Sequence, residues 1–217
     1  MKVLITLPNY DDATSYLYHY GKKVVEFAEA RGISIVQFSR PRLRRKNVEK
    51  SIEKLDPSIL LFNAHGNDFT IYGDKINDQE EPIIVERENH KLLEGRITYA
   101  RACWAALSLG KACTENGGCF IGYKVPFSFW IDQKWSATPL KDRNARLFLE
   151  PSNQVAISLL KKKSAYEAVQ RFYNLSKKNM LKLVKNKEEP GALAAAMVLW
   201  NNMEGQEILG DSSMKAT

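Results

Sequence analysis

The sequence predicts an α/β protein built on a mostly parallel sheet. Three short apolar runs, Val3 to Leu7, Ile33 to Phe38 and Ile59 to Ala64, are typical of buried strands. Two segments with helical spacing separate them, Tyr16 to Arg31 and Val48 to Leu55. This β-α-β-α-β order predicts parallel strands, right-handed crossovers and helices on both faces of the sheet.

The middle of the chain predicts two more strands, Ile97 to Cys103 and Cys119 to Tyr123, with a helix from Ala105 to Cys113 between them. Ahead of these strands lies an insert that we expect to cover the functional site. It should contain a hairpin that turns at Gly73-Asp74, an extended piece at Pro82 to Val85 and a short helical piece ending at Gly95.

From Pro139 onward the chain is predicted to be helical, over 153–160, 164–184 and 191–203. The helix 164–184 has an apolar stripe, which needs a partner surface. We therefore expect one domain over 1–217, with a core of about 1–137 and a helical part of about 138–217 packed on the sheet. A helical tail that binds a regulator is the alternative, and 210–217 is expected to be loose in either case.

The chain is basic. Its 217 residues contain 32 Lys and Arg against 25 Asp and Glu, which gives a formal charge of +7. Most of this charge is expected on solvated helix faces, and a nucleic-acid surface is the sharper but less favoured alternative. The basic residues form four clusters: Arg42-Arg44-Arg45-Lys46, Lys161-Lys162-Lys163, Lys177-Lys178 and Lys182-Lys185-Lys187.

Three cysteines argue against a disulfide framework and for a reducing compartment. The apolar start of the chain is too short for a signal peptide, and no run approaches the ~20 residues of a membrane helix. We therefore predict a cytoplasmic protein that does not bind membranes. The Cys and His residues lack ligand spacing, so no metal and no other cofactor is expected.

Two strand ends carry the candidate chemistry. His65 follows the strand that begins at Ile59, and Cys103 ends the strand that begins at Ile97. If these strands are parallel neighbours, their ends lie side by side at the edge where open α/β sheets bind ligands. His65 and Cys103 would then meet as base and nucleophile, and a helix starting directly after Cys103 would favour its thiolate.

Gly66 lets backbone approach a ligand closely, and its N–H is expected to join the Cys103 N–H in stabilising an oxyanion. The commoner role of a free cysteine is that of a small buried hydrophobe, and this is what we expect of Cys113 and Cys119. His19 and His90 have no partner motif and are not expected to be catalytic.

Four motifs stand out between residues 58 and 131: Asn63-Ala64-His65-Gly66, Ala100-Arg101-Ala102-Cys103, Leu109-Gly110 and Gly117-Gly118-Cys119-Phe120-Ile121-Gly122-Tyr123. Together they resemble the caspase-like (clan CD) cysteine peptidases of gingipain and CHAT type. Cys103 follows His65 by 38 residues, a spacing compatible with that group.

The resemblance implies a three-layer α/β/α sandwich and peptide-bond hydrolysis through an acyl-enzyme. It implies a Cys-His dyad without an obligatory third member: Cys103 as nucleophile, His65 as base and acid, and the Gly66 and Cys103 amides as oxyanion donors. The chain departs from the group in showing no interdomain cleavage linker, so we expect no two-chain maturation, and no second domain that would sense a signal.

The function predicted is that of a cysteine endopeptidase that cleaves a polypeptide. Its expected context is a prokaryotic defence or regulatory proteolysis system, in which a regulatory protein could be a further partner. A catalytically silent caspase-like binding or regulatory subunit is the main alternative, although the chain retains both dyad residues. A nucleic-acid-binding α/β protein is a third, and it rests only on charge.

Substrate preference has two conflicting clues in the sequence. By the resemblance, the end of the first strand and the position two before the nucleophile line the specificity pocket, which here means Asp11 or Asp12, and Arg101. The acids would select Arg or Lys before the scissile bond, and Arg101 would select Asp or Glu. Together they would favour a polar uncharged side chain, unless Arg101 points into the core. Capping of the first helix is the alternative role for either acid, and a basic residue before the cut is narrowly preferred.

Overall fold

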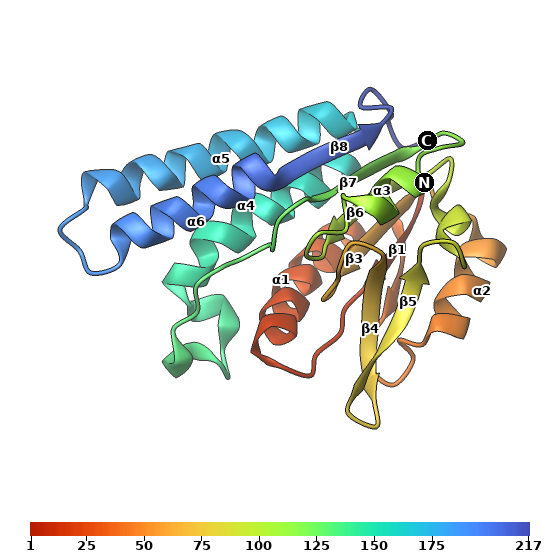
Figure 1. The fold of residues 1–217 in the computed structure, drawn as a ribbon, viewed down its shortest axis with the longest axis horizontal. Coiled ribbons are helices and arrows are strands. Elements are labelled where there is room, and N and C mark those ends of the chain that lie inside the picture. Colours follow the sequence, from red (N-terminus) through yellow and green to blue (C-terminus); the bar gives the residue numbers. More distant parts are fainter.

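The computed structural model describes all of residues 1–217, and a six-stranded sheet lies at its centre (Figure 1). The strand order is β2-β1-β3-β6-β7-β8, in which only the last pair, β7 and β8, is antiparallel. The sheet strands are β1 (Lys2–Thr6), β2 (Ser34–Phe38), β3 (Ile59–Asn63), β6 (Ile97–Arg101), β7 (Cys119–Tyr123) and β8 (Gln206–Gly210). The predicted parallel α/β architecture is confirmed.

One face of the sheet packs against α1 (Asp12–Glu29), α4 (Arg143–Leu160) and α5 (Ala165–Lys185). Because successive side chains of a strand point to opposite faces, Ile59 and Leu61 of β3 join this core together with Phe172 of α5. The C-terminal helices therefore share a core with the sheet.

The other face packs against α2 (Arg45–Leu55), a two-stranded hairpin of β4 (Thr70–Ile76) and β5 (Gln79–Val85), a short 3₁₀ helix (His90–Leu93) and α3 (Ser108–Ala112). Leu60 and Phe62 of β3 point into this second core. The two cores make the molecule a three-layer α/β/α structure (Figure 1).

The hairpin turns later than the sequence suggested. The residues between β4 and β5 are Asn77 and Asp78, both at positive φ (50° and 64°), whereas Gly73 and Asp74 lie inside β4. Asn and Asp tolerate this left-handed conformation, which two-residue hairpin turns require. Gly73 instead allows close packing, because a Cβ there would lie 2.6 Å from the side chain of Ile83.

The helix α6 (Ala192–Gly205) runs antiparallel beside α5 and leads directly into β8 (Figure 1). The strand β8 was not predicted from the sequence.

In α4, Pro151 cannot donate to the carbonyl of Leu147 four residues earlier. The side-chain amide of Asn179 on α5 donates to that carbonyl at 2.9 Å, which ties α4 to α5. Two remaining 3₁₀ turns cover Gln133–Trp135 and Pro139–Lys141. No helix combines the length and apolarity needed to cross a membrane.

Candidate active site

The fold brings His65 and Cys103 to one edge of the sheet. Strands β3 and β6 are parallel neighbours with Asn63 paired to Arg101, so each candidate residue lies two positions beyond a paired residue. The Ala64 N–H still donates to the Arg101 carbonyl at 3.2 Å. The two strand ends therefore run on side by side into the site.

Gly66 makes the closest backbone approach in the site. A Cβ on Gly66 would lie 2.9 Å from the Cβ of Ala102 and 3.2 Å from the carbonyl oxygen of Cys103. Only a residue without a side chain fits such a position without displacing its neighbours. The His-Gly pair is thus packed directly against the chain at Cys103.

The Cys103 thiol is half-buried, and its surroundings act on its pKa in both directions. Burial raises the pKa of Cys103, while the backbone N–H groups of Phe127 and of Cys103 itself act in the opposite direction. The expected helix does not begin at this residue: α3 starts only at Ser108, after a series of turns. A macrodipole acts within the first turn of a helix, so α3 does not activate the thiol as the sequence suggested.

His65 is held by an acid. Its Nε2 lies 2.8 Å from Oδ2 of Asp11, which precedes α1. A neutral imidazole that donates from Nε2 carries its lone pair on Nδ1, and Nδ1 has no hydrogen-bond partner in the protein. The acid therefore leaves Nδ1 as the basic atom of the ring.

Asp11 also caps α1. Its Oδ1 accepts hydrogen bonds from the Thr14 N–H at 2.8 Å and the Thr14 hydroxyl at 2.7 Å, which forms a capping box. Burial alone would raise the pKa of Asp11, but the bonds from Thr14 and His65 outweigh it and hold the pKa below its ordinary value. One oxygen serves the helix and the other serves His65, so Asp11 remains ionised.

The expected oxyanion donors have no oxygen acceptor within the protein. The Gly66 and Cys103 N–H groups donate to no oxygen of the protein, whereas the neighbouring Asn67 N–H is bonded to the Thr70 carbonyl. Unpaired N–H groups beside a nucleophile are the arrangement that a developing oxyanion requires.

Arg101 lies in the core, with only 2% of its surface exposed. Its guanidinium donates to Asn63 Oδ1 at 2.6 Å, Ser152 Oγ at 3.3 Å and Asn153 Oδ1 at 2.8 Å. A side chain that is enclosed between β3 and α4 cannot line an open pocket. This burial argues against the expected role of Arg101 in substrate binding and corresponds to the alternative in which it points into the core.

Asp12 remains exposed in the first turn of α1, where its Oδ2 accepts a hydrogen bond from Gln133 at 3.1 Å. The hairpin approaches the site from the other side: the Tyr10 hydroxyl donates to Glu80 Oε1 at 2.6 Å. The Tyr10 ring lies 6.1 Å from that of His65. The insert therefore contacts the chain beside the candidate base, through residues that the sequence did not single out.

Trp104, directly after Cys103, has φ of 58° and a 40% exposed side chain. Positive φ is a strained conformation for a bulky residue and is frequent at functional sites. Its N–H donates to the Val125 carbonyl at 3.3 Å, which ties this turn to the segment that follows β7. The sequence shows a tryptophan directly after the candidate cysteine, but it does not show that this residue has a positive φ and is exposed.

No three His, Cys, Asp or Glu side chains converge to form a metal site. The hollows of about 400 Å³ along α4 and α5 include neither His65 nor Cys103 in their walls. The candidate site lies outside these hollows, at the neighbouring ends of β3 and β6.

No family model and no curated protein sequence matches this chain. The structure resembles the complex of the pro- and mature domains of Porphyromonas gingivalis RgpB, with a TM-score of 0.53, 9% identity and coverage of 99% of this chain and 48% of that one. It also resembles the Arg-specific cysteine proteinase gingipain R, with a TM-score of 0.54, 11% identity and coverage of 99% and 47%.

The chain thus spans about half the length of the gingipain chains it matches. Its fold is the caspase-like α/β fold that the gingipains, cysteine proteinases of clan CD, share. Identities this low show the fold alone.

Proposed function

We propose that this protein is a cysteine endopeptidase in which Cys103 is the nucleophile, His65 the general base and acid, and Asp11 the residue that positions His65. The observation that carries the proposal is the joint placement of a His held by an acid and a half-buried Cys on adjacent ends of β3 and β6. A base and a nucleophile at neighbouring strand ends, with the base oriented by a third group, support covalent catalysis.

In the proposed reaction, Nδ1 of His65 takes the Cys103 thiol proton as the sulfur attacks the peptide carbonyl carbon. The Gly66 and Cys103 N–H groups stabilise the resulting oxyanion. The C–N bond then breaks, and His65 passes its proton to the departing amine. Water hydrolyses the thioester after losing a proton to His65, which finally returns that proton to the sulfur.

Asp11 stabilises the imidazolium that forms between these proton transfers, as the acid of a catalytic triad does. Because burial raises the pKa of Cys103, the free thiol is protonated at neutral pH. The proton therefore moves to His65 during attack on the substrate.

The proposed substrate is an extended polypeptide with a basic residue before the scissile bond. Arg101 is buried and cannot select an acidic side chain, whereas the carboxylates of Asp11, which also holds His65, and of Asp12, which is exposed, both lie at the start of α1. A cation placed before the cut would match these charges. We further propose selective cleavage of protein partners, as in a CHAT-type regulatory or defence system of prokaryotes, because the side chains of His65 and Asp11 are 35% and 37% exposed and can be reached by an exposed segment of another chain.

The alternative is a catalytically silent caspase-like subunit that binds protein partners. Incubation of the full chain with a peptide library, followed by mass spectrometry of the new termini, separates the two. The proposal expects cleavage by the wild type and none by folded Cys103→Ala or His65→Ala. Equal cleavage by wild type and Cys103→Ala, or binding of peptides without any cleavage, would refute it.

A further inference from the structure

The positive charge of the chain is concentrated in one segment. Residues 161–187 contain nine Lys and Arg and one Glu, which leaves 23 basic and 24 acidic residues in the rest of the chain. The segment therefore carries the entire net positive charge. Three of the four basic clusters, which are separate in the sequence, lie on or beside the single helix α5.

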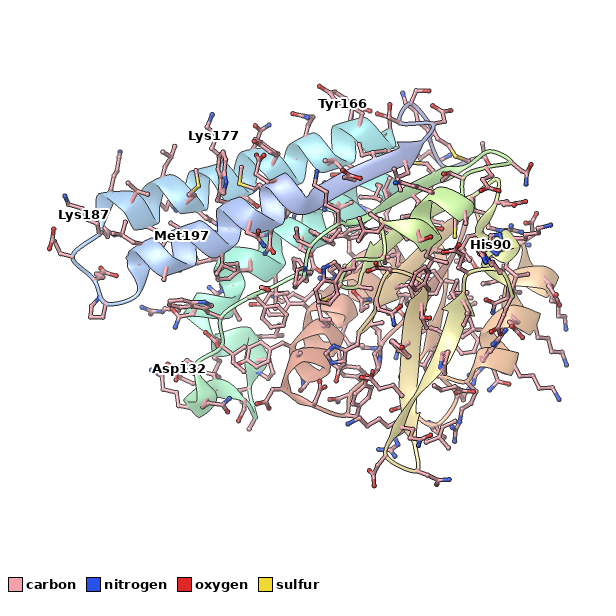
Figure 2. All side chains as sticks on the ribbon, viewed as in Figure 1. His90, Asp132, Tyr166, Lys177, Lys187 and Met197 are labelled. Atoms are coloured by element: carbon pink, nitrogen blue, oxygen red, sulfur yellow. The ribbon has the colours of Figure 1, made fainter.

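These cations are exposed, and the protein neutralises almost none of them. Lys163 pairs with Glu167 at 3.0 Å, but Arg171, Lys177, Lys178, Lys182 and Lys185 have no carboxylate within 4.0 Å. Solvated helix faces usually mix both signs of charge, because adjacent like charges repel. In Figure 2, Lys177 and Tyr166 project from α5 away from the body of the molecule.

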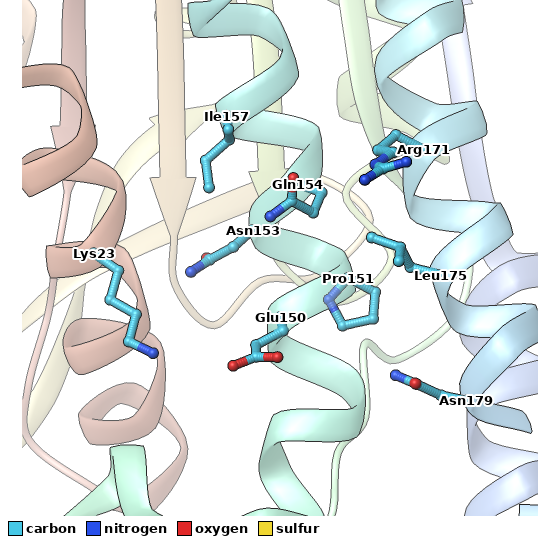
Figure 3. Close-up of a pocket in the computed structure, with 9 residues that line it drawn as sticks. All are labelled: Lys23, Glu150, Pro151, Asn153, Gln154, Ile157, Arg171, Leu175 and Asn179. Carbon is cyan, nitrogen blue, oxygen red and sulfur yellow. The ribbon is translucent and has the colours of Figure 1, made fainter. Parts of the chain in front are cut away.

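Three hollows lie along α5, and successive hollows share lining residues; we call the three together the basic groove. The first, between α1, α4 and α5, has a volume of about 410 Å³ and is shown in Figure 3. It shares Gln154 and Arg171 with the second, of about 430 Å³, which in turn shares Asn174 with the third, of about 400 Å³.

The lining of the basic groove identifies the kind of partner. Amides and hydroxyls alternate with the cations: Gln154, Gln170, Asn174, Asn179, Ser158 and Tyr166. Lys and Arg interspersed with Asn, Gln, Ser and Tyr are the side chains that contact phosphate and sugar in nucleic-acid complexes. Leu181 is the single large aliphatic side chain in this lining that is exposed, and the other exposed apolar side chains nearby, Val184 on α5 and Leu193, Met197 and Trp200 on α6, lie outside it. A membrane-binding face would need such side chains among the lysines.

We propose that the basic groove along α5 binds the phosphodiester backbone of a duplex nucleic acid. The part of α5 from Arg171 to Lys185 is about 21 Å long, which spans roughly six phosphates of one strand. A duplex is preferred over a single strand because Tyr166 is the one exposed aromatic side chain in the lining, whereas single-strand sites stack bases on several aromatics. Glu150 stands at the α1 end of the groove, so the phosphates follow α5 from Arg171 toward Lys185.

The test measures binding of a fluorescent 20-base-pair DNA duplex of arbitrary sequence to the full chain by anisotropy, over a range of salt concentrations. It does not depend on peptidase activity. The variant is Lys177→Gln with Lys178→Gln, Lys182→Gln and Lys185→Gln. The control removes the same charge from the exposed residues of α2 and the neighbouring 3₁₀ helix, through Lys46→Gln, Lys50→Gln, Lys54→Gln and Lys91→Gln.

Wild type should bind with a dissociation constant in the range of about 10⁻⁴ to 10⁻⁶ M at physiological salt, as non-specific binders do. The α5 variant should lose at least tenfold in affinity, and its salt slope should fall by about 3 to 4, since each phosphate contact contributes about 0.9. The control variant should change less than threefold, and replacing the same four α5 lysines by Arg should retain binding.

No binding by wild type, equal losses in the two Gln variants, or binding that salt does not weaken would overturn the proposal. So would tighter binding to a single strand of the same sequence, or to anionic phosphatidylserine vesicles, than to the duplex. Circular dichroism of each variant confirms that the helices are retained, which excludes unfolding as the cause of a loss.

Discussion

Nε2 of His65 lies 2.8 Å from Oδ2 of Asp11, a residue 54 positions earlier that also caps the first helix. The pair joins the end of β3 to the start of α1. It adds a third member to an arrangement that the sequence resemblance predicted as a dyad of Cys103 and His65.

Asp11→Ser separates the two roles of the acid. Serine is as good an N-cap as aspartate, but it is too short and uncharged to hold His65. We expect kcat to fall roughly 100-fold, in the range of general acid-base effects, while the midpoint of thermal unfolding changes little. Steady-state kinetics on a cleaved peptide, with circular dichroism melts, measure both. An unchanged kcat would show that Asp11 serves the helix alone.

Asp11→Ala should lower the free energy of unfolding by about 1 kcal/mol at neutral pH, because the helix cap is lost. The pKa of Asp11 in the folded chain lies below its unfolded value of about 3.9. Its contribution is therefore complete above about pH 4 and is lost as the pH falls through the folded pKa. Urea unfolding of both proteins between pH 2 and pH 7 should show the difference shrinking at the acid end. A difference that stays constant to pH 2 would contradict this assignment.

Alkylation of Cys103 by iodoacetamide should be slow at neutral pH and should accelerate beyond pH 9. The reason is that burial raises the pKa of this thiol and the thiolate is the reacting form. Burial also raises the pKa values of Cys113 and Cys119, that of Cys119 to about 12, so these residues should react only after unfolding. Peptide mapping of the label tests this, and a rate that is already maximal at pH 6 would indicate a preformed thiolate.

Arg101→Met should destabilise the fold by roughly 2–4 kcal/mol without changing substrate preference. The substitution leaves the Asn63 and Asn153 acceptors buried and unpaired, at a cost of about 1–3 kcal/mol each. Urea unfolding gives the stability. Cleavage profiles of the same peptide library give the preferred residue before the scissile bond. A change in how well acidic residues are accepted at that position would show that Arg101 contacts the substrate.

A chain that ends at Leu149 should fail to fold. It would lack the half of α4 that packs on the sheet through Val155 and Leu159, as well as α5 and its buried Phe172. It would also lack β8 and so expose the edge of β7. A soluble fragment with cooperative unfolding and native circular dichroism would show instead that the C-terminal part is a separate module.

The parallel strands could be predicted because each is a short, mainly apolar run between helical patterns, and β3 and β7 are buried along their whole length. β8 could not, since Gln206–Gly210 contains only two apolar residues and follows α6 without a turn. The delayed start of α3 also has no sequence signal. Trp104 has a positive φ, and its N–H is bonded to the carbonyl of Val125, a contact that only the tertiary structure brings about.

The positions of His65 and Cys103 followed from their strands, but the partners of His65 did not. Asp11 meets His65 only through the tertiary arrangement of α1 and β3. The burial of Arg101 was within reach of the sequence: Ile97, Tyr99 and Arg101 alternate along β6, so Arg101 shares the helix-covered face with two core residues. The local pattern therefore outweighed the pocket position that the resemblance implied.

The most direct test of the peptidase assignment is labelling of the full chain with a peptidyl ketone that alkylates a thiol only when its peptide, ending in Arg, occupies the active site. Intact mass and peptide mapping should show one label per chain on Cys103. The label should be blocked by competing peptide and absent in His65→Ala. Labelling of Cys113 or Cys119 instead, or labelling of Cys103 that proceeds equally with a reagent lacking the peptide, would contradict the assignment.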